Sequence, residues 1–235
     1  MKFAKHFTRR KERRAFTLLE LLVVMGLIAT FSLLMIGHLE NGGRAASLKS
    51  AQAILANLVT AARTNSLASG QSSRLLVQVD AASSSDPQRY LRYVVVQLNT
   101  VDGWKTITDT FLPDDVYIVP GNFGSLPGGL FATSVTVPWR KADGTDLRST
   151  ALRSDQIFSG TINGNISEQW VGVVLSSNAG TLQSGDVVLA TGRRKAPGSY
   201  AEGDAPIELV NPADVRGLTL SSYGVPAFIN ARTSF

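Results

Sequence analysis

The sequence predicts an α+β protein in which one long N-terminal helix is followed by an antiparallel β domain. Three observations carry this prediction. Residues 16–36 form an apolar stretch, residues 44–68 repeat apolar side chains at helical spacing, and short β-type runs fill the chain beyond Gly70. Runs of strands without helices between them favour an antiparallel sheet over a doubly wound parallel sheet.

The chain begins with a basic leader and continues into the apolar stretch. Residues 1–15 hold seven Lys or Arg and one acid, a net charge of +6, which leaves 16 of the 23 basic and 17 of the 18 acidic residues elsewhere, a net of −1. A helix over residues 16–36, at about 1.5 Å per residue, spans about 30 Å, the thickness of a bilayer's hydrocarbon core. Because positive flanks stay in the cytoplasm, the C-terminal bulk is expected to be exported.

Glu20 is the one charged residue between residues 16 and 36. An acid at the centre of a membrane helix costs about 2.5–3.5 kcal/mol, and less near the interface. A cost of that size indicates that Glu20 has a function.

Residues 37–70 are expected to continue the helix as an amphipathic segment. The sequence Asn41-Gly42-Gly43 commonly ends or kinks a helix, so continuity at this point is left open. From Arg44 onward the apolar side chains recur on one face. This face consists of Leu48, Ala51, Leu55, Leu58 and Ala62. We expect it to pack on the sheet, and we expect the helix to end near Gly70.

Ten β-type runs follow within the expected globular domain of residues 71–235. They cover residues 74–79, 90–98, 104–108, 115–119, 134–139, 170–175, 186–190, 207–210, 217–220 and 225–229. A stretch rich in glycine and proline over residues 121–129 interrupts the pattern, and residues 134–169 have the character of an insertion. With no cysteine in the chain, an apolar core must hold this domain without disulfides.

Residues that could carry catalysis are sparse. The two histidines, His6 and His38, lie in the leader and just past the apolar stretch, far from the β domain. Without cysteine or a histidine in that domain, most nucleophile–base pairs are excluded. The acid pair Asp114-Asp115 is typical of a turn. The sequence therefore predicts no enzyme, no catalytic residue, no cofactor and no metal site.

One basic turn is a candidate nucleic-acid contact. Arg193, Arg194 and Lys195 are consecutive, with Tyr200 nearby. A turn with three charges is more often ordinary solvated surface. Nucleic acid is therefore not an expected partner.

The junction between leader and helix carries a recognisable motif. It reads Ala15-Phe16-Thr17-Leu18-Leu19-Glu20. This resembles the processing site of type IV prepilins and type II secretion pseudopilins, in which a basic leader and a small residue precede Phe-Thr-Leu-x-Glu and an apolar helix. The resemblance implies a pilin-like fold, cleavage between Ala15 and Phe16, N-methylation of Phe16, and pairing of Glu20 with a neighbouring terminus during assembly. The departure is Ala15, where glycine is usual.

Two plainer interpretations of this stretch are a cleaved secretory signal and an ordinary single-span anchor. The apolar run exceeds the roughly 7–15 residues of a signal core, and only the junction motif separates an anchor from a pilin. A looser resemblance, over residues 61–79 and 111–116, is to minor pseudopilins of the H type in type II secretion.

The resemblance implies a structural subunit of a type II secretion pseudopilus or of a type IV pilus-like filament. Such a subunit crosses the bacterial inner membrane once, with a cytoplasmic N-terminus and a periplasmic or extracytoplasmic C-terminal domain. Its implied partners are prepilin peptidase, other pilins or pseudopilins, an inner-membrane assembly platform with its ATPase, and membrane lipid. The alternative is a minor pilin at the filament tip that binds DNA or an exported substrate. Salt-dependent DNA binding would separate the two.

Overall fold

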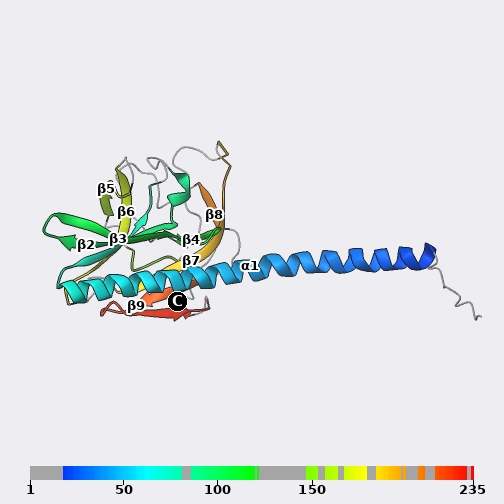
Figure 1. Cartoon of the computed structure of the whole chain (residues 1–235), viewed down its shortest axis with the longest axis horizontal. Helices are drawn as coiled ribbons and strands as arrows, with labels where there is room; N and C mark the ends of the chain where they lie inside the picture. The colour runs from blue at the N-terminus through cyan, green and yellow to red at the C-terminus, as the bar shows by residue number, and fades with distance from the viewer. Residues whose placement is uncertain are drawn as a thin grey trace, which may run out of the picture. The chain divides into compact units, whose positions relative to one another are not determined.

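The computed structural model describes residues 18–80, 86–119, 121, 147–152, 157–163, 167–178, 184–196, 198–199, 206–209, 215–231 and 234–235, except for the side chains of residues 33–42 and 157. Its contacts divide the chain into two units, Met1–Gly42 and Gly43–Phe235. Helix α1 belongs to both units, and all the described strands belong to the second (Figure 1).

Helix α1 spans Leu18–Ser69, a length of 52 residues. The backbone remains helical through residues 41–43, where the sequence left an end or a kink open. Each glycine there costs about 1 kcal/mol relative to alanine, an amount that long helical flanks can offset. The helix ends where expected, since Gly70 adopts a φ of +65°, a left-handed conformation that glycine reaches cheaply.

The first sheet, sheet A, has five strands in the order β3-β2-β1-β6-β5. Its strands are β1 (Ser73–Gln78), β2 (Tyr93–Thr100), β3 (Gly103–Phe111), β5 (Ile157–Gly160) and β6 (Glu168–Leu175). The short 3₁₀ helix η1 (Pro87–Arg89) precedes β2. In the middle of the sheet, Leu76 on β1 lies opposite Val95 on β2 and Gly172 on β6. The central strand β1 therefore joins segments that lie far apart in sequence.

The second sheet, sheet B, follows the order β10-β9-β7-β4, and β8 pairs with the end of β7. Its strands are β4 (Val116–Val119), β7 (Gly185–Arg194), β8 (Ile207–Leu209), β9 (Val215–Leu220) and β10 (Pro226–Ile229). The described pairings of both sheets are antiparallel. The expected α+β class is thus confirmed, and the strands are divided between two sheets.

One apolar core joins the second half of α1 to both sheets. The expected helix face is buried, with Leu48, Ala51, Leu55, Leu58 and Ala62 all in this core. They share it with residues of sheet A and of sheet B, among them Val77, Val94, Val173, Val187, Leu189 and Leu218. Figure 1 shows this part of the helix lying along the strands. The side-chain amide of Gln52 adds a polar link, because it donates to the carbonyl oxygens of Gly217 at 2.7 Å and Ile229 at 3.0 Å.

Nine of the ten expected β runs coincide with strands, with ends that shift by a few residues. The tenth, residues 134–139, lies outside the described residues, as does most of the stretch over residues 121–129. Strand β5 was not expected. It is only four residues long, ends in glycine, and lies within the segment interpreted as an insertion. Its place in the sheet comes from its pairing with β6. A pairing between two separate strands leaves no local signal in the sequence.

Candidate functional site

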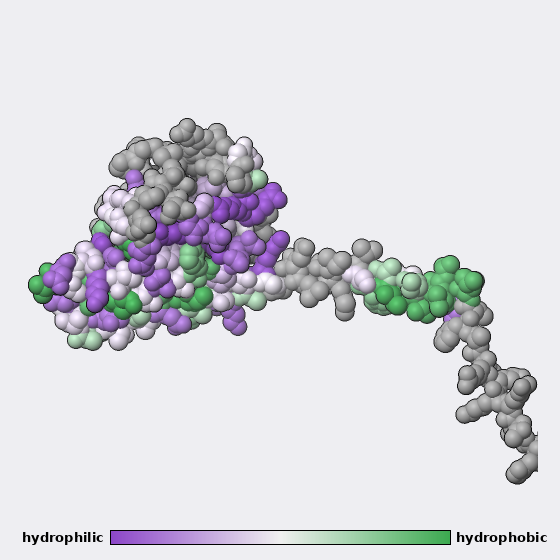
Figure 2. Space-filling model, turned by 45° about the horizontal axis from the view of Figure 1, so that its top comes forward, coloured by the Kyte–Doolittle hydropathy of each residue, from purple (hydrophilic) through white to green (hydrophobic). Residues whose placement is uncertain are grey.

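The first part of α1, residues 18–32, exposes apolar side chains in every direction. The large exposed ones are Leu18, Leu19, Leu21, Leu22, Val23, Val24, Met25, Leu27, Ile28 and Phe31. Figure 2 shows this segment as a predominantly hydrophobic surface. A helix on the surface of a globular domain usually has one apolar stripe and one polar face. A segment that is apolar all round needs apolar surroundings, and we call residues 18–32 the apolar segment.

The hydroxyl groups of the apolar segment are satisfied within the helix itself. Thr30 Oγ1 donates to the carbonyl oxygen of Gly26 at 2.8 Å, and Ser32 Oγ donates to that of Ile28 at 2.8 Å. Hydroxyls bonded to the preceding turn need no water. The segment is therefore compatible with a lipid or protein environment along its length.

Glu20 lies in the first turn of α1 and is exposed. The first turn of a helix stabilises a negative charge by about 0.3–1 kcal/mol, because its unpaired N–H groups carry partial positive charge. The expected cleavage and methylation positions, Ala15 and Phe16, lie outside the described residues. The structure thus places Glu20 at the start of the described helix and leaves the processing site a prediction.

Within the residues that the structure describes, no helix combines the length and the apolar character of a membrane span. The expected span of residues 16–36 stays a prediction. Residues 16 and 17, and the side chains of residues 33–36, lie outside the described part.

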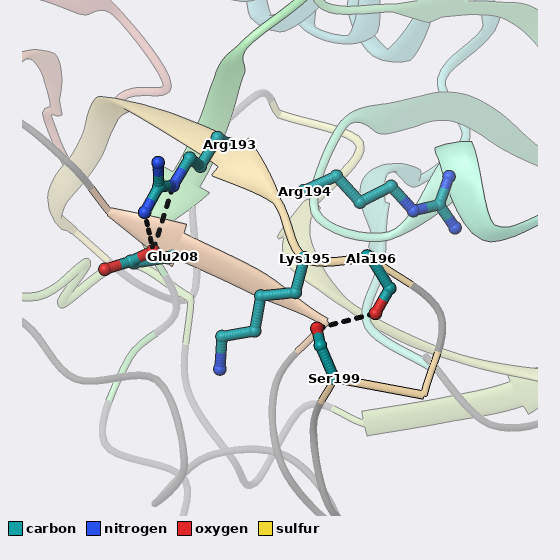
Figure 3. A pocket seen from close by; sticks show the side chains of 6 residues that line it. All are labelled: Arg193, Arg194, Lys195, Ala196, Ser199 and Glu208. Atoms are coloured by element: carbon teal, nitrogen blue, oxygen red, sulfur yellow. Dashed lines mark hydrogen bonds and ion pairs between the residues drawn. The ribbon is translucent and has the colours of Figure 1, made fainter.

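The basic turn lies at the end of β7, where this strand pairs with β8. Arg193, Arg194 and Lys195 line an open hollow of about 470 Å³ together with Ala196, Ser199 and Glu208 (Figure 3). Arg193 donates from Nε at 3.0 Å and Nη2 at 2.8 Å to Oε2 of Glu208, so one of the three charges is paired. Both partners of this pair are well exposed to solvent, which limits its contribution to stability. Among the described residues that line the hollow, Arg194 and Lys195 add two further basic side chains.

Sequence reasoning did not identify a group of arginines that stack on aromatic rings of sheet A. Arg89 lies over Tyr93 and Trp170, and Arg74 lies over Trp104 and Phe158. The one local signal was a charged residue inside a strand-type run, at Arg74. Tyr93 follows Arg89 by four residues, but Trp170, Trp104 and Phe158 come from strands distant in sequence from the arginines that they contact, so no spacing rule could have joined them.

The described chain thus combines an apolar helix, with an acid in its first turn, and an antiparallel β domain. The family model described as the prokaryotic N-terminal methylation motif matches residues 10–36. The chain therefore carries the N-terminal motif of prepilins, and the resemblance inferred from the leader junction is confirmed over that stretch.

The other comparisons are weaker. No curated protein matches the chain. Among solved structures, the chain is similar to the minor pseudopilin EpsH from the type 2 secretion system of Vibrio cholerae, with 12% identity and a TM-score of 0.38 over 79% of this chain and 97% of that one. A likeness at this level identifies neither a function nor a partner.

Proposed function

We propose that the chain is a pseudopilin or minor pilin that is inserted in the bacterial inner membrane and assembled into a filament through the apolar segment. In this role prepilin peptidase cleaves between Ala15 and Phe16, and Phe16 becomes the methylated N-terminus. The domain after Gly43 lies outside the cytoplasm. The partners are other pilins or pseudopilins, the assembly platform with its ATPase, and membrane lipid.

The observation that carries this proposal is the apolar segment with Glu20 in its first turn, inside a matched methylation motif. Apolar side chains on all sides of the apolar segment leave no polar face toward water. Lipid covers such a segment before assembly, and neighbouring helices cover it afterwards. The same segment therefore serves as the membrane anchor before assembly and as the contact between subunits in the filament.

Cleavage would create a positive charge close to Glu20. The new amino group of Phe16 lies four residues earlier, on the same chain or on an adjacent one. A charge pair in a low-dielectric environment is much stronger than one in water, so it could set the register between packed helices. The plainer alternative is that Glu20 only interacts with its own helix N-terminus or reaches toward the headgroups.

Substitution of Glu20 distinguishes these two roles. Because the chain has no cysteine, a single cysteine introduced at Leu27 reports helix contacts between subunits by oxidative cross-linking in cells. We expect Glu20→Leu and Glu20→Gln to be inserted and cleaved, and yet to lose most of the cross-linked multimer. Glu20→Asp should retain part of it.

The matched control is Glu40→Gln, which removes an acid from the same helix outside the apolar segment. This variant should cross-link like the unmodified chain. Wild-type cross-linking by Glu20→Leu would contradict the assembly role of Glu20.

The alternative of a tip subunit that binds DNA rests on the basic hollow at the end of β7. If Arg194 and Lys195 contact phosphates, the affinity for duplex DNA should fall steeply between 50 and 200 mM salt, which is about the range over which phosphate contacts weaken strongly. Affinity that does not change with salt, or that survives replacement of both residues by alanine, would remove this alternative.

A further inference from the structure

Sheet A has a second face, turned away from α1, with a small apolar cluster of its own. The members of this cluster are Leu76, Tyr93, Val95, Ile162 and Trp170, with Phe158 packed against them. Side chains alternate along a strand, so on β1 Leu75 and Val77 enter the main core, whereas Arg74 and Leu76 lie on the opposite face. We call this the outer face of sheet A. Two arginines, Arg89 and Arg74, lie among its aromatic rings.

Arg89 contacts two aromatic rings, a carboxylate and a backbone carbonyl oxygen. Its Cζ lies 4.4 Å from the ring centroid of Tyr93 and 5.3 Å from that of Trp170. Its Nη1 forms an ion pair with Oε2 of Glu168 at 2.8 Å, and its Nη2 donates to the carbonyl oxygen of Ile162 at 2.8 Å. Both charged side chains are almost fully buried. Arg89 is thus a closed structural site with its own carboxylate.

Arg74 also lies over two aromatic rings, and within the described part of the chain it has an amide partner in place of a carboxylate. Its Cζ lies 4.1 Å from the ring centroid of Trp104 and 4.7 Å from that of Phe158. Its Nε donates to Oε1 of Gln97 at 2.9 Å, and Nε2 of Gln97 lies 3.2 Å from Oγ1 of Thr106. Among the described residues, no acid forms an ion pair with Arg74.

The electrostatic state of Arg74 follows from this arrangement. Burial lowers the pKa of its guanidinium to about 10, because nearby rings replace water around the charge. The contacts with two rings and the hydrogen bond at Nε restrict the orientation of the guanidinium. The Nη1 and Nη2 atoms remain as a rigid fork, the geometry that binds a carboxylate through two parallel hydrogen bonds.

The apolar rim of this site lies on β3, an edge strand of sheet A. Trp104, Ile107 and Phe111 on this strand are large apolar side chains that are between 37% and 41% exposed. An arginine and a tryptophan surrounded by apolar contacts are typical of the energetic centre of a protein–protein interface. The site therefore fits a partner that brings an acid with apolar neighbours.

We propose that Arg74, held between Trp104 and Phe158, is a docking site for an acidic side chain of another protein subunit. The partner's carboxylate forms an ion pair with Arg74, as Glu168 does with Arg89. The apolar neighbours of that acid cover the exposed side chains of β3. This inference rests on the proposed function only for the identity of the partner as a subunit. The binding chemistry is independent of it.

A minimal probe tests the site directly. The full chain in detergent is titrated with a capped valine–glutamate–valine tripeptide and with its glutamine counterpart, and the Nε–H resonance of Arg74 is followed by NMR. We expect the glutamate peptide to shift this resonance and to bind at least tenfold more tightly than the glutamine peptide, since a charged partner roughly doubles the strength of a hydrogen bond. Equal affinity for the two peptides, or no detectable shift, would overturn the proposal.

Variants assign the binding to Arg74, with intrinsic fluorescence as the readout common to all of them. Arg74→Met should bind the glutamate peptide at least tenfold more weakly, and Arg74→Lys, which keeps the charge but loses the planar fork, should fall between it and the unmodified chain. The control is Arg216→Met on β9 of sheet B, where the partly exposed Arg216 donates to Asn230. Unchanged affinity in Arg74→Met would overturn the proposal, and a matching loss in Arg216→Met would do the same.

One more variant tests whether Asp155 of this chain is the natural partner of Arg74. Asp155 is the acid nearest in sequence to Phe158 and lies outside the described residues. Asp155→Asn should leave the affinity for the glutamate peptide unchanged, and a clear gain would show that an internal acid already occupies Arg74. These titrations need no filament, so they can fail while the Glu20 cross-linking succeeds, and the reverse also holds.

Discussion

The two halves of α1 carry similar apolar side chains in opposite environments. Leu27, in the apolar segment, is 54% exposed, whereas Leu55, in the second half, is 0% exposed. Leu55 is covered by strands of the same chain, and among the described residues nothing comparable covers Leu27. We therefore expect folding of the β domain to depend on the second half and not on the first. The first half of α1 is suited to apolar surroundings that the described part of the chain does not provide.

The largest effect should come from placing the same charge in each half. Leu55→Asp removes a buried leucine and puts an unpaired acid in the core, so we expect a loss of at least about 4 kcal/mol in the free energy of unfolding. Leu27→Asp should leave the unfolding of the β domain unchanged. Denaturant titration of the full chain in detergent, followed by tryptophan fluorescence, measures both. A similar loss from the two variants would contradict the division of α1.

A smaller effect should follow from removing the polar link between α1 and sheet B. Gln52→Leu keeps the volume but leaves the carbonyl oxygens of Gly217 and Ile229 without the donor that they share. Buried acceptors that lose their partner cost about 1–3 kcal/mol. Lys49→Leu, on the exposed face of the same helical turn, should change the free energy of unfolding by less than about 0.5 kcal/mol. Equal effects would show that Gln52 does not anchor the helix.

The smallest effect concerns alkaline pH and the β domain alone. Burial raises the pKa of Tyr90 above its ordinary value of 10.0, and it also raises the pKa values of Tyr93 and Tyr117. A raised pKa in the folded state means that the unfolded chain releases its proton first. The stability is therefore fully present below pH 10 and falls as pH rises above it.

Tyr90→Phe isolates one such group. At pH 11, the fall in unfolding free energy from pH 9 should be about 1 kcal/mol smaller than in the unmodified chain, as measured by denaturant titration at both values. Tyr223→Phe, at an exposed position, is the control and should behave like the unmodified chain. Identical falls in all three proteins would contradict the role of burial at Tyr90.

Local patterns were sufficient to predict helix α1 and nine of the ten described strands. The spacing of Leu48, Leu55 and Leu58 predicted the buried face of α1, and Gly70 predicted its end. The pairing of the strands could not be predicted from local patterns, because β1 pairs with both β2 and β6. The partner of Leu76 on β6 is Gly172, almost a hundred residues later. Division into two sheets is a consequence of such distant pairings, which carry no local signal.

The candidate site shows the same limit. Glu20 could be identified because the leader, the junction and the apolar run are contiguous in sequence. The arginines of the outer face could not, since Arg74 meets Trp104 and Phe158 only after the five strands of sheet A have assembled. Their contrasting partners, a carboxylate for Arg89 and an amide for Arg74, became visible only in the folded chain.

Intact-mass and N-terminal analysis of the chain extracted from membranes tests most directly whether the first half of α1 is a processed assembly element. We predict that the mature chain begins at Phe16 and carries one added methyl group on its amino terminus. Inhibition or deletion of the cognate prepilin peptidase should restore the leader. A chain that retains Met1 in the presence of an active peptidase, or one that begins beyond residue 36, would contradict the proposed role.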